Sequence, residues 1–182
     1  MLTEKIRKVK LLILDVDGVL TDGRIVYDTE GRELRFFDAQ DGVGVRLLKA
    51  AGIKTIMITI KPCKADGYRA MDMMVEEVYQ GVSRKTDLLP QILERHGVGT
   101  DEICYVGDDV VDLGMMRMVG FPTAVENGCS EVKKAASYVT KKSGGRGAVR
   151  EIAELILVKQ GKWHETLILE FGLSLGPDKS AG

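Results

Sequence analysis

Short runs of apolar residues alternate along the chain with longer segments whose apolar positions recur at helical spacing. The runs predict strands at Leu11–Leu14, Ile53–Ile60, Val75–Tyr79, Ile103–Val106, Phe121–Val125 and Tyr138–Thr140. The intervening segments predict helices at Asp41–Ala51, Pro62–Met74, Ser83–His96, Asp109–Val119, Glu131–Ala136 and Ala148–Lys159. Strands that alternate with helices at this spacing predict an α/β fold of three layers, a parallel sheet with helices on both faces.

Two further β-prone segments interrupt this alternation after the first strand. Ile25–Tyr27 and Leu34–Phe37 flank a polar loop centred on Gly31, which predicts a β-hairpin. A hairpin of this length can serve as a flap over a site but not as a large cap domain. Among the helices, Asp41 and Ser83 are the expected N-caps of the segments that follow them.

Length, charge and cysteine content limit the class of protein. The 182 residues are expected to form one domain over residues 1–160, with the flap at 24–38 and a C-terminal tail at 161–182. The net charge of -1 provides no basic field for nucleic acid. The apolar run near the N-terminus ends at Asp15 and is too short for a signal peptide or a membrane span. A cytoplasmic setting is expected, because three scattered cysteines argue against a disulfide framework or a zinc site; they are Cys63, Cys104 and Cys129.

Candidate chemistry begins where the first strand ends, in the stretch LLILDVDGVLTDG of Leu11–Gly23. Asp15 and Asp17 lie one residue apart, so they share a face only while the strand continues. Two carboxylates this close repel each other unless a positive charge lies between them. The simpler interpretation is a strand that ends in a polar turn, with Asp17 and Gly18 as turn formers.

Three polar residues elsewhere fall at the same expected edge of the sheet. Thr59 lies near the end of one predicted strand, Asp108 follows another, and Lys85 lies early in a predicted helix. Ligands of parallel sheets bind beyond the carboxyl ends of the strands, so these residues are expected to meet Asp15. A carboxylate such as Asp15 can attack phosphorus, but it needs a cation to approach a phosphate dianion. Asp108 supplies a second carboxylate for an octahedral oxygen site that suits Mg²⁺.

The motif DVDGVLTDG resembles the first motif of the haloacid dehalogenase superfamily of phosphatases, Asp-x-Asp-Gly-x-x-x-[Thr/Ser]. Over roughly Val9–Val158 the chain is similar to the small capless sugar-acid phosphatases of that superfamily. The resemblance implies a Rossmann-like fold without a large cap, and a Mg²⁺-dependent phosphomonoesterase that forms an aspartyl-phosphate intermediate. It implies 3-deoxy-D-manno-octulosonate 8-phosphate as the substrate, in lipopolysaccharide precursor synthesis, with a nonulosonate 9-phosphate as the alternative.

The resemblance also implies a role for each residue at the predicted edge. Asp15 and Asp108 would bind Mg²⁺ through their side chains, and Asp17 through its backbone carbonyl. The Asp17 carboxylate would then serve as the general acid and base. Lys85 would neutralise the phosphate and hold Asp15, although a lone lysine on a helix is usually a solvated charge. Thr59 would donate a hydrogen bond to a phosphoryl oxygen, although a strand threonine is often only structural.

Other candidates have less specific signals. Asp109 and Asp112 are expected to support the metal ligands, while N-capping of the next helix is the simpler interpretation of both residues. The Gly144–Gly147 turn is either an anion site at a helix N-terminus or a tight loop. The candidates for substrate binding that the resemblance implies are Lys61, Asp38, Asp41, Gly42, Arg146 and Arg150.

The chain departs from the family pattern in one place, where Thr-Gly-Arg is replaced by Thr59-Ile60-Lys61. A lysine keeps the positive charge of the arginine but lacks the planar fork that suits a carboxylate. Such drift raises the alternative of a non-catalytic oligomerisation or regulatory module, which is expected to have lost Asp15, Asp17 or Lys85. The resemblance further implies a homotetramer, for which the hairpin supplies apolar contacts from Ile25, Val26, Leu34, Phe36 and Phe37.

Overall fold

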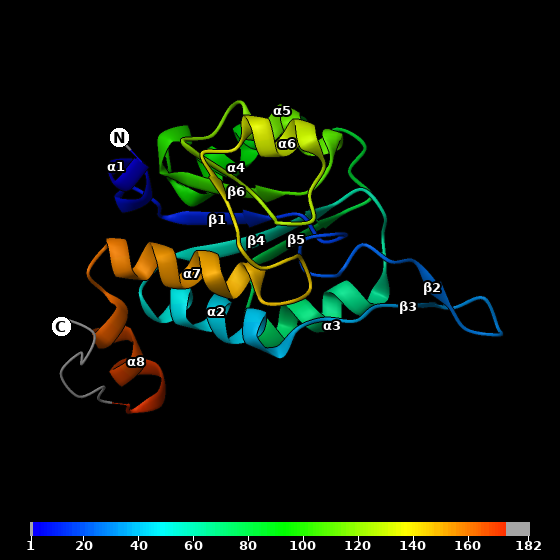
Figure 1. Ribbon diagram of the computed structural model, residues 1–182, viewed down its shortest axis with the longest axis horizontal. Coiled ribbons are helices and arrows are strands. Elements are labelled where there is room, and N and C mark those ends of the chain that lie inside the picture. The colour runs from blue at the N-terminus through cyan, green and yellow to red at the C-terminus, as the bar shows by residue number, and fades with distance from the viewer. Residues whose placement is uncertain (1, 174–182) are drawn as a thin grey trace.

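The computed structural model describes residues 2–173 and shows a three-layer α/β fold without a large cap domain (Figure 1). The central sheet is parallel, and its six strands in spatial order are β5 (Glu77–Gln80), β4 (Lys54–Thr59), β1 (Leu11–Leu14), β6 (Ile103–Gly107), β7 (Phe121–Ala124) and β8 (Tyr138–Val139). Because β1 pairs in parallel with both β4 and β6, the carboxyl ends of these three strands lie at one edge of the sheet.

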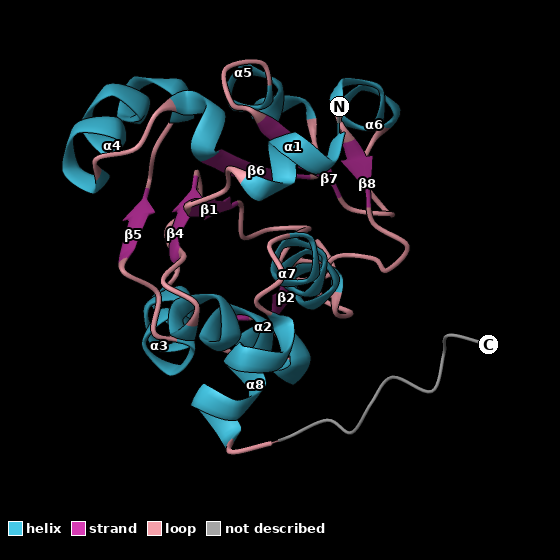
Figure 2. Ribbon diagram, turned by 90° about the vertical axis from the view of Figure 1, so that its left-hand side faces the viewer, coloured by secondary structure: helices cyan, strands magenta, loops and turns pink. Residues whose placement is uncertain are grey.

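Helices cover both faces of the sheet (Figure 2). One face carries α2 (Ala39–Ala50), α3 (Lys64–Met73) and α7 (Ala148–Lys159), and the other carries α4 (Leu89–His96), α5 (Leu113–Met116) and α6 (Ser130–Ala135). In β1, Leu12 and Leu14 pack in the core beneath α2 and α7, whereas Leu11 and Ile13 pack beneath α4 and α5. Burial on both faces explains why this strand is a continuous apolar run.

Three elements lie outside these layers. Helix α1 (Leu2–Arg7) packs on α7, and α8 (Trp163–Phe171) packs on α2 and α7. The predicted hairpin is present, with β2 (Val26–Tyr27) antiparallel to β3 (Glu33–Leu34), and it projects away from the body of the molecule (Figure 1). The predicted C-terminal tail thus contains α8, and its residues 174–182 lie outside the described residues. No helix within residues 2–173 is long and apolar enough to cross a bilayer.

The segment predicted as one helix from Ser83 is divided. It begins with a 3-10 turn, η1 (Lys85–Leu88), and continues as α4, which has Pro90 in its first turn. Proline is accommodated there because its missing N–H falls among the donors that a helix start leaves unpaired. Ser83 was the wrong choice of cap, since the extended residue before η1 is Arg84 and no side chain caps this start.

The segment predicted as a helix over Asp109–Val119 is also shorter than expected. A 3-10 turn, η3 (Val110–Asp112), precedes the single turn of α5. The Asp112 carboxylate accepts hydrogen bonds from the backbone N–H groups of Asp108 (2.9 Å) and Asp109 (3.3 Å). These bonds tighten the chain just after β6 and hold the loop that carries Asp108 in place.

Helix α2 begins earlier than predicted, because Asp38 and not Asp41 is its N-cap. The Asp38 carboxylate accepts a hydrogen bond from the Gln40 N–H at 2.7 Å. Asp41 lies inside the first turn, fully buried, and accepts a hydrogen bond from the backbone N–H of Arg150 at 2.9 Å. Asp41 therefore joins α2 to the start of α7. Strand β5 begins after Val75, whose N–H bonds to the carbonyl of Ala70 at the end of α3.

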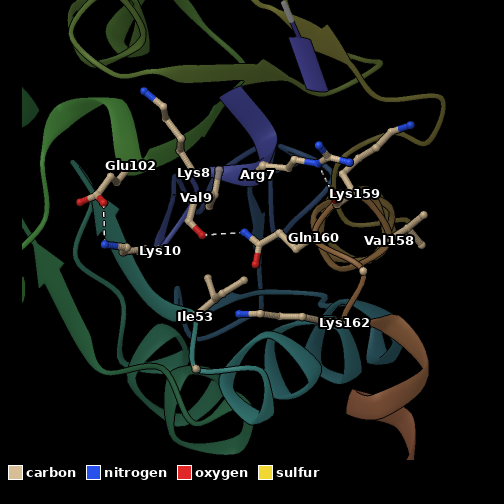
Figure 3. Close-up of a pocket in the computed structure, with 12 residues that line it drawn as sticks. Arg7, Lys8, Val9, Lys10, Ile53, Glu102, Val158, Lys159, Gln160 and Lys162 are labelled. Carbon is tan, nitrogen blue, oxygen red and sulfur yellow. Dashed lines mark hydrogen bonds and ion pairs between the residues drawn. The ribbon is translucent and has the colours of Figure 1, made fainter. Parts of the chain in front are cut away.

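At the opposite edge of the sheet, where the strands begin, the surface has a hollow of about 680 Å³ rich in basic side chains (Figure 3). Gln160 donates to the carbonyl of Val9 at 2.8 Å and ties α7 to the start of β1. Arg7 donates to the last carbonyl of α7 and Lys162 to the carbonyl that follows α2, both at 3.1 Å. Cations stabilise the unpaired carbonyls of helix C-termini, so these contacts account for Arg7 and Lys162.

Candidate active site

A smaller pocket of about 240 Å³ opens at the carboxyl edge of β1, β4 and β6. Its lining consists of Asp15, Asp17, Gly23, Thr59, Ile60, Lys61, Lys85, Asp108, Asp109 and Val111. The structure therefore brings together all four predicted catalytic residues and the three predicted metal ligands, along with Lys61 and Asp109. We infer that this pocket, and not the larger basic hollow, is the candidate active site.

The buried amine of Lys85 is the central positive charge of the site. Its Nζ lies 2.8 Å from Oδ1 of Asp15 and 2.8 Å from Oδ1 of Asp112, and only 2% of the side chain is exposed. Burial alone lowers the pKa of Lys85, but the two carboxylates outweigh this effect and raise it above its usual value. The Tyr105 hydroxyl also donates to Asp112 at 2.6 Å. Lys85 is thus a charged group that holds Asp15, not a solvated lysine.

Carboxylate oxygens gather beside this amine. One oxygen each of Asp15, Asp108 and Asp112 lie within 4.8 Å of one another. Burial, followed by the charge of Asp112, raises the pKa of Asp15 to about 7 despite Lys85. Burial, followed by the charge of Asp15, raises the pKa of Asp108 to about 8. A divalent cation between Asp15 and Asp108 would relieve this repulsion and favour the ionised form of both.

The backbone beside these carboxylates also fits a metal site. Gly18 has a φ of +82°, and a Cβ at this position would lie 2.0 Å from Oδ2 of Asp108. Only glycine allows the chain after Asp17 to approach Asp108 so closely. Asp112 is less available as a ligand, because one oxygen accepts from Lys85 and Tyr105 and the other from backbone N–H groups. An all-oxygen set from Asp15, Asp108 and the backbone suits a hard cation such as Mg²⁺.

The Asp17 carboxylate is held from two sides. Its Oδ2 accepts a hydrogen bond from the Thr59 hydroxyl at 3.3 Å, and its Oδ1 lies 3.2 Å from Nη1 of Arg35. The Arg35 side chain is 2% exposed and also forms ion pairs with Asp66 at 3.0 Å and Glu33 at 3.2 Å. Burial lowers the pKa of Arg35, but the neighbouring acids, Asp17 first, outweigh this effect and raise it. Sequence reasoning missed Arg35 and Asp66.

Lys61 joins the pocket to the hairpin. Its Nζ lies 2.5 Å from Oε2 of Glu33 and 3.4 Å from the hydroxyl of Tyr27, and it lies 5.4 Å from the centroid of the Tyr27 ring. Both partners belong to the hairpin. Lys61 therefore contacts the flap and lines the pocket at the same time, while Ile60 beside it is 40% exposed.

The glycine-rich turn packs against the catalytic loop. A Cβ at Gly144 would lie 1.7 Å from the carbonyl oxygen of Gly18, so only glycine fits at this contact. The Arg146 side chain is 70% exposed, and its nearest ion-pair partner is Asp22 at 3.5 Å. This arrangement favours the tight-loop interpretation of the turn, because its backbone supports the loop after β1.

The remaining candidates for substrate binding do not line the pocket. Asp38 caps α2, and its carbonyl accepts a hydrogen bond from Arg69 at 2.6 Å. Gly42 lies against the same Arg69 guanidinium. The Arg150 guanidinium lies 5.6 Å from the centroid of the Trp163 ring, between α7 and α8. These side chains support α2, α7 and α8.

Comparison with known proteins places these features in a family. Residues 50–152 match the family described as haloacid dehalogenase-like hydrolase. The 3-deoxy-D-manno-octulosonate 8-phosphate phosphatase of Escherichia coli K12 is 39% identical over 161 residues, which cover 88% of this chain and 86% of the relative.

Solved structures agree with the sequence comparison. A Legionella pneumophila hydrolase of the HAD superfamily, subfamily III A, superposes with a TM-score of 0.91 at 38% identity and 94% coverage of both chains. The 3-deoxy-D-manno-octulosonate 8-phosphate phosphatase of Moraxella catarrhalis superposes with a TM-score of 0.88 at 37% identity, covering 91% of this chain and 95% of the other. That structure contains magnesium, phosphate and the sugar acid.

Proposed function

Because this chain belongs to the haloacid dehalogenase-like hydrolases, and among them to the 3-deoxy-D-manno-octulosonate 8-phosphate phosphatases, we propose that it hydrolyses 3-deoxy-D-manno-octulosonate 8-phosphate to the free sugar acid and phosphate. Its place would be lipopolysaccharide precursor synthesis. The observation that carries the proposal is Asp15, held at 2.8 Å by the buried amine of Lys85 at the carboxyl edge of the sheet. Asp15, Asp17 and Lys85 are all retained, so the chain is an enzyme and not a non-catalytic module.

The residues of the pocket divide the reaction between them. Asp15 attacks phosphorus, so that a bond forms between its carboxylate oxygen and phosphorus while the bond to the sugar oxygen breaks. Asp17 donates a proton to the departing alkoxide and then accepts one from the water that hydrolyses the aspartyl-phosphate. Lys85 offsets the negative charge of the phosphoryl oxygens, and the Thr59 hydroxyl would donate to one of them when Asp17 carries the proton.

Asp15, Asp108 and the backbone carbonyl of Asp17 are the groups that would bind Mg²⁺. The bound ion would supply the positive charge that lets an anionic nucleophile meet a phosphate dianion. The fit rests on the gathered carboxylate oxygens and on the close approach of the Gly18 backbone to Asp108. The magnesium in the Moraxella catarrhalis relative supports Mg²⁺ as the ion.

The exposed apolar side chains of the hairpin support the proposal of a homotetramer, in which neighbouring copies would cover the open pocket. The hairpin exposes large apolar side chains that a monomer would leave in water, with exposed fractions of 60% for Ile25, 59% for Tyr27 and 66% for Phe36. Phe37 is less available, because it packs against the core. Clustered exposure of this kind is typical of an interaction surface.

A phosphate-release assay with Mg²⁺ tests the proposed function. We expect the parent chain to release phosphate from 3-deoxy-D-manno-octulosonate 8-phosphate with a higher kcat/KM than from a nonulosonate 9-phosphate. Asp15→Asn should remove this activity, while Asp72→Asn, which changes an exposed carboxylate on α3, should leave it unchanged. Release from neither substrate would refute the proposal, and a preference for the nonulosonate would correct the substrate.

A further inference from the structure

We propose that Arg35 is the positioning residue for the acid–base carboxylate, holding Asp17 in its working orientation and coupling that orientation to the hairpin. This inference rests on the proposed function, in which Asp17 donates the proton to the leaving group. It concerns a residue that lies outside the pocket lining and acts only through Asp17.

The guanidinium of Arg35 is enclosed. Arg35 follows β3 directly, yet its side chain turns inward and is 2% exposed, whereas Leu34 and Phe36 beside it are 44% and 66% exposed. It forms ion pairs with acids of three segments: Asp17 after β1, Asp66 in the first turn of α3, and Glu33 in β3. None of its three side-chain nitrogens makes a hydrogen bond within residues 2–173, so the guanidinium is held in place by the charges of these acids on several sides.

Asp66 is buried at a cost in free energy. This carboxylate is fully buried, and neither of its oxygens has a hydrogen bond within residues 2–173. Its ion-pair partner in that part of the chain is Arg35, through Nη1 at 3.0 Å. Burying a carboxylate is unfavourable unless a cation compensates it. The role that explains the burial of Asp66 is therefore to hold Arg35 in place. The same Nη1 lies 3.2 Å from Asp17 and thus joins the two acids.

Arg35 and Thr59 together fix the orientation of the Asp17 carboxylate. With Arg35 at Oδ1 and the Thr59 hydroxyl at Oδ2, both carboxylate oxygens are held although the side chain is 39% exposed. The positive charge of Arg35 disfavours a proton on Oδ1, whereas the Thr59 hydroxyl beside Oδ2 can both donate and accept a hydrogen bond. Oδ2 is therefore the oxygen left to carry the proton that Asp17 transfers. Without Arg35, the carboxylate could rotate and present either oxygen.

The ion-pair network around Arg35 also includes the flap. Glu33 pairs with Arg35 on one side and with Lys61 on the other. Because ion pairs join Glu33 to Arg35 and Arg35 to Asp17, a displacement of β3 would move Arg35 and Asp17 together. Contacts that neighbouring copies make with the hairpin would reach the acid–base residue by this route.

The test compares two leaving groups on the full-length chain with Mg²⁺. An alkoxide needs a proton to depart, whereas p-nitrophenolate does not, so loss of acid function selectively harms the sugar phosphate. We expect Arg35→Met to lower kcat/KM, which reports the steps up to departure of the leaving group and not the later hydrolysis of the aspartyl-phosphate. The loss should be at least about tenfold on 3-deoxy-D-manno-octulosonate 8-phosphate and less than about threefold on p-nitrophenyl phosphate. Asp17→Asn is the reference for this pattern. Arg32→Met is the matched control, because Arg32 lies on the same hairpin and pairs with Asp28.

Two further variants provide the test if Arg35→Met does not fold. Asp66→Asn removes the anchoring charge without touching the pocket, and Arg35→Lys keeps the charge without the planar guanidinium. Both should lose less activity than Arg35→Met, and the loss should again be larger on the sugar phosphate than on p-nitrophenyl phosphate. Equal losses on the two substrates, or no loss, would overturn the role of Arg35. A parent chain that hydrolyses p-nitrophenyl phosphate but neither sugar-acid phosphate would instead refute the proposed function.

Discussion

Replacing Asp41 with asparagine should stabilise the fold at neutral pH. The Asp41 side chain is fully buried, and one oxygen accepts a hydrogen bond from the backbone N–H of Arg150 at the start of α7. The other oxygen has no hydrogen bond within the described residues. Burial, with a smaller contribution from the charge of Asp38, raises the pKa of Asp41 from 3.8 to about 6.

The sign and size of the effect follow from this shift. Between pH 3.8 and about 6, the folded chain binds the Asp41 proton more tightly than the unfolded chain does, so stability falls as the pH rises. Above this window the cost is complete, about 3 kcal/mol at 1.36 kcal/mol per pKa unit. Asparagine keeps the acceptor for α7 and carries no charge. The advantage of Asp41→Asn should therefore be near zero at about pH 4 and reach about 3 kcal/mol by about pH 7.

Urea unfolding of both chains across this pH range measures the difference directly. Groups common to both chains cancel in the difference, and Asp72→Asn controls for the loss of an exposed negative charge on α3. A difference that does not change with pH, or a variant less stable than the parent at about pH 7, would refute the reasoning. Asp41 is also a candidate for substrate binding, which the kinetics of Asp41→Asn test. An unchanged KM for the sugar-acid phosphate supports a structural role, and a raised KM supports contact with substrate.

Three shorter predictions concern the pocket and the flap. Asp15→Asn should lower turnover by at least about a thousandfold without changing the unfolding transition, and a chelator should abolish parent activity until Mg²⁺ is restored; substantial activity in either case contradicts the mechanism. Lys61→Ala, which breaks the ion pair with Glu33, should raise KM more for the sugar-acid phosphate than for a neutral sugar phosphate; kinetics identical to the parent would remove Lys61 from the site. Ile25→Ser with Phe36→Ser should reduce the mass in solution from tetramer to smaller species, and a fully active monomeric parent would refute the assembly.

Much of the fold could be predicted because burial on both faces of a parallel sheet is visible in the sequence. The run Leu11–Leu14 carries no polar residue, since α2 and α7 cover one side and α4 and α5 the other. Helix starts were harder, because they depend on contacts distant in sequence. Asp38 and Asp41 are both acceptable caps locally, and the choice is made by the start of α7, which takes Asp41 into the core.

The residues of the candidate site also divide into those that the sequence predicts and those that it does not. Asp15, Thr59 and Asp108 could be found because each lies at or directly after the carboxyl end of a strand that ends at the pocket. Arg35 and Asp66 could not, because no local pattern relates a hairpin arginine to the first turn of α3. The available signal was weak: Arg35 interrupts the apolar segment Leu34–Phe37, in which its neighbours Leu34 and Phe36 face solvent.

The replacement of Thr-Gly-Arg by Thr59-Ile60-Lys61 can be understood from this network. Its three carboxylates, on Asp17, Glu33 and Asp66, are compensated by two cations from different segments. Asp17 and Asp66 share Nη1 of Arg35, which reaches them from the hairpin, and Nη2 of the same guanidinium lies 3.2 Å from Glu33. Glu33 is reached from the other side by Lys61, where a flexible point charge is sufficient. The positive charge beside Asp17 thus comes from the flap, and Lys61 pairs with Glu33 and not with Asp17.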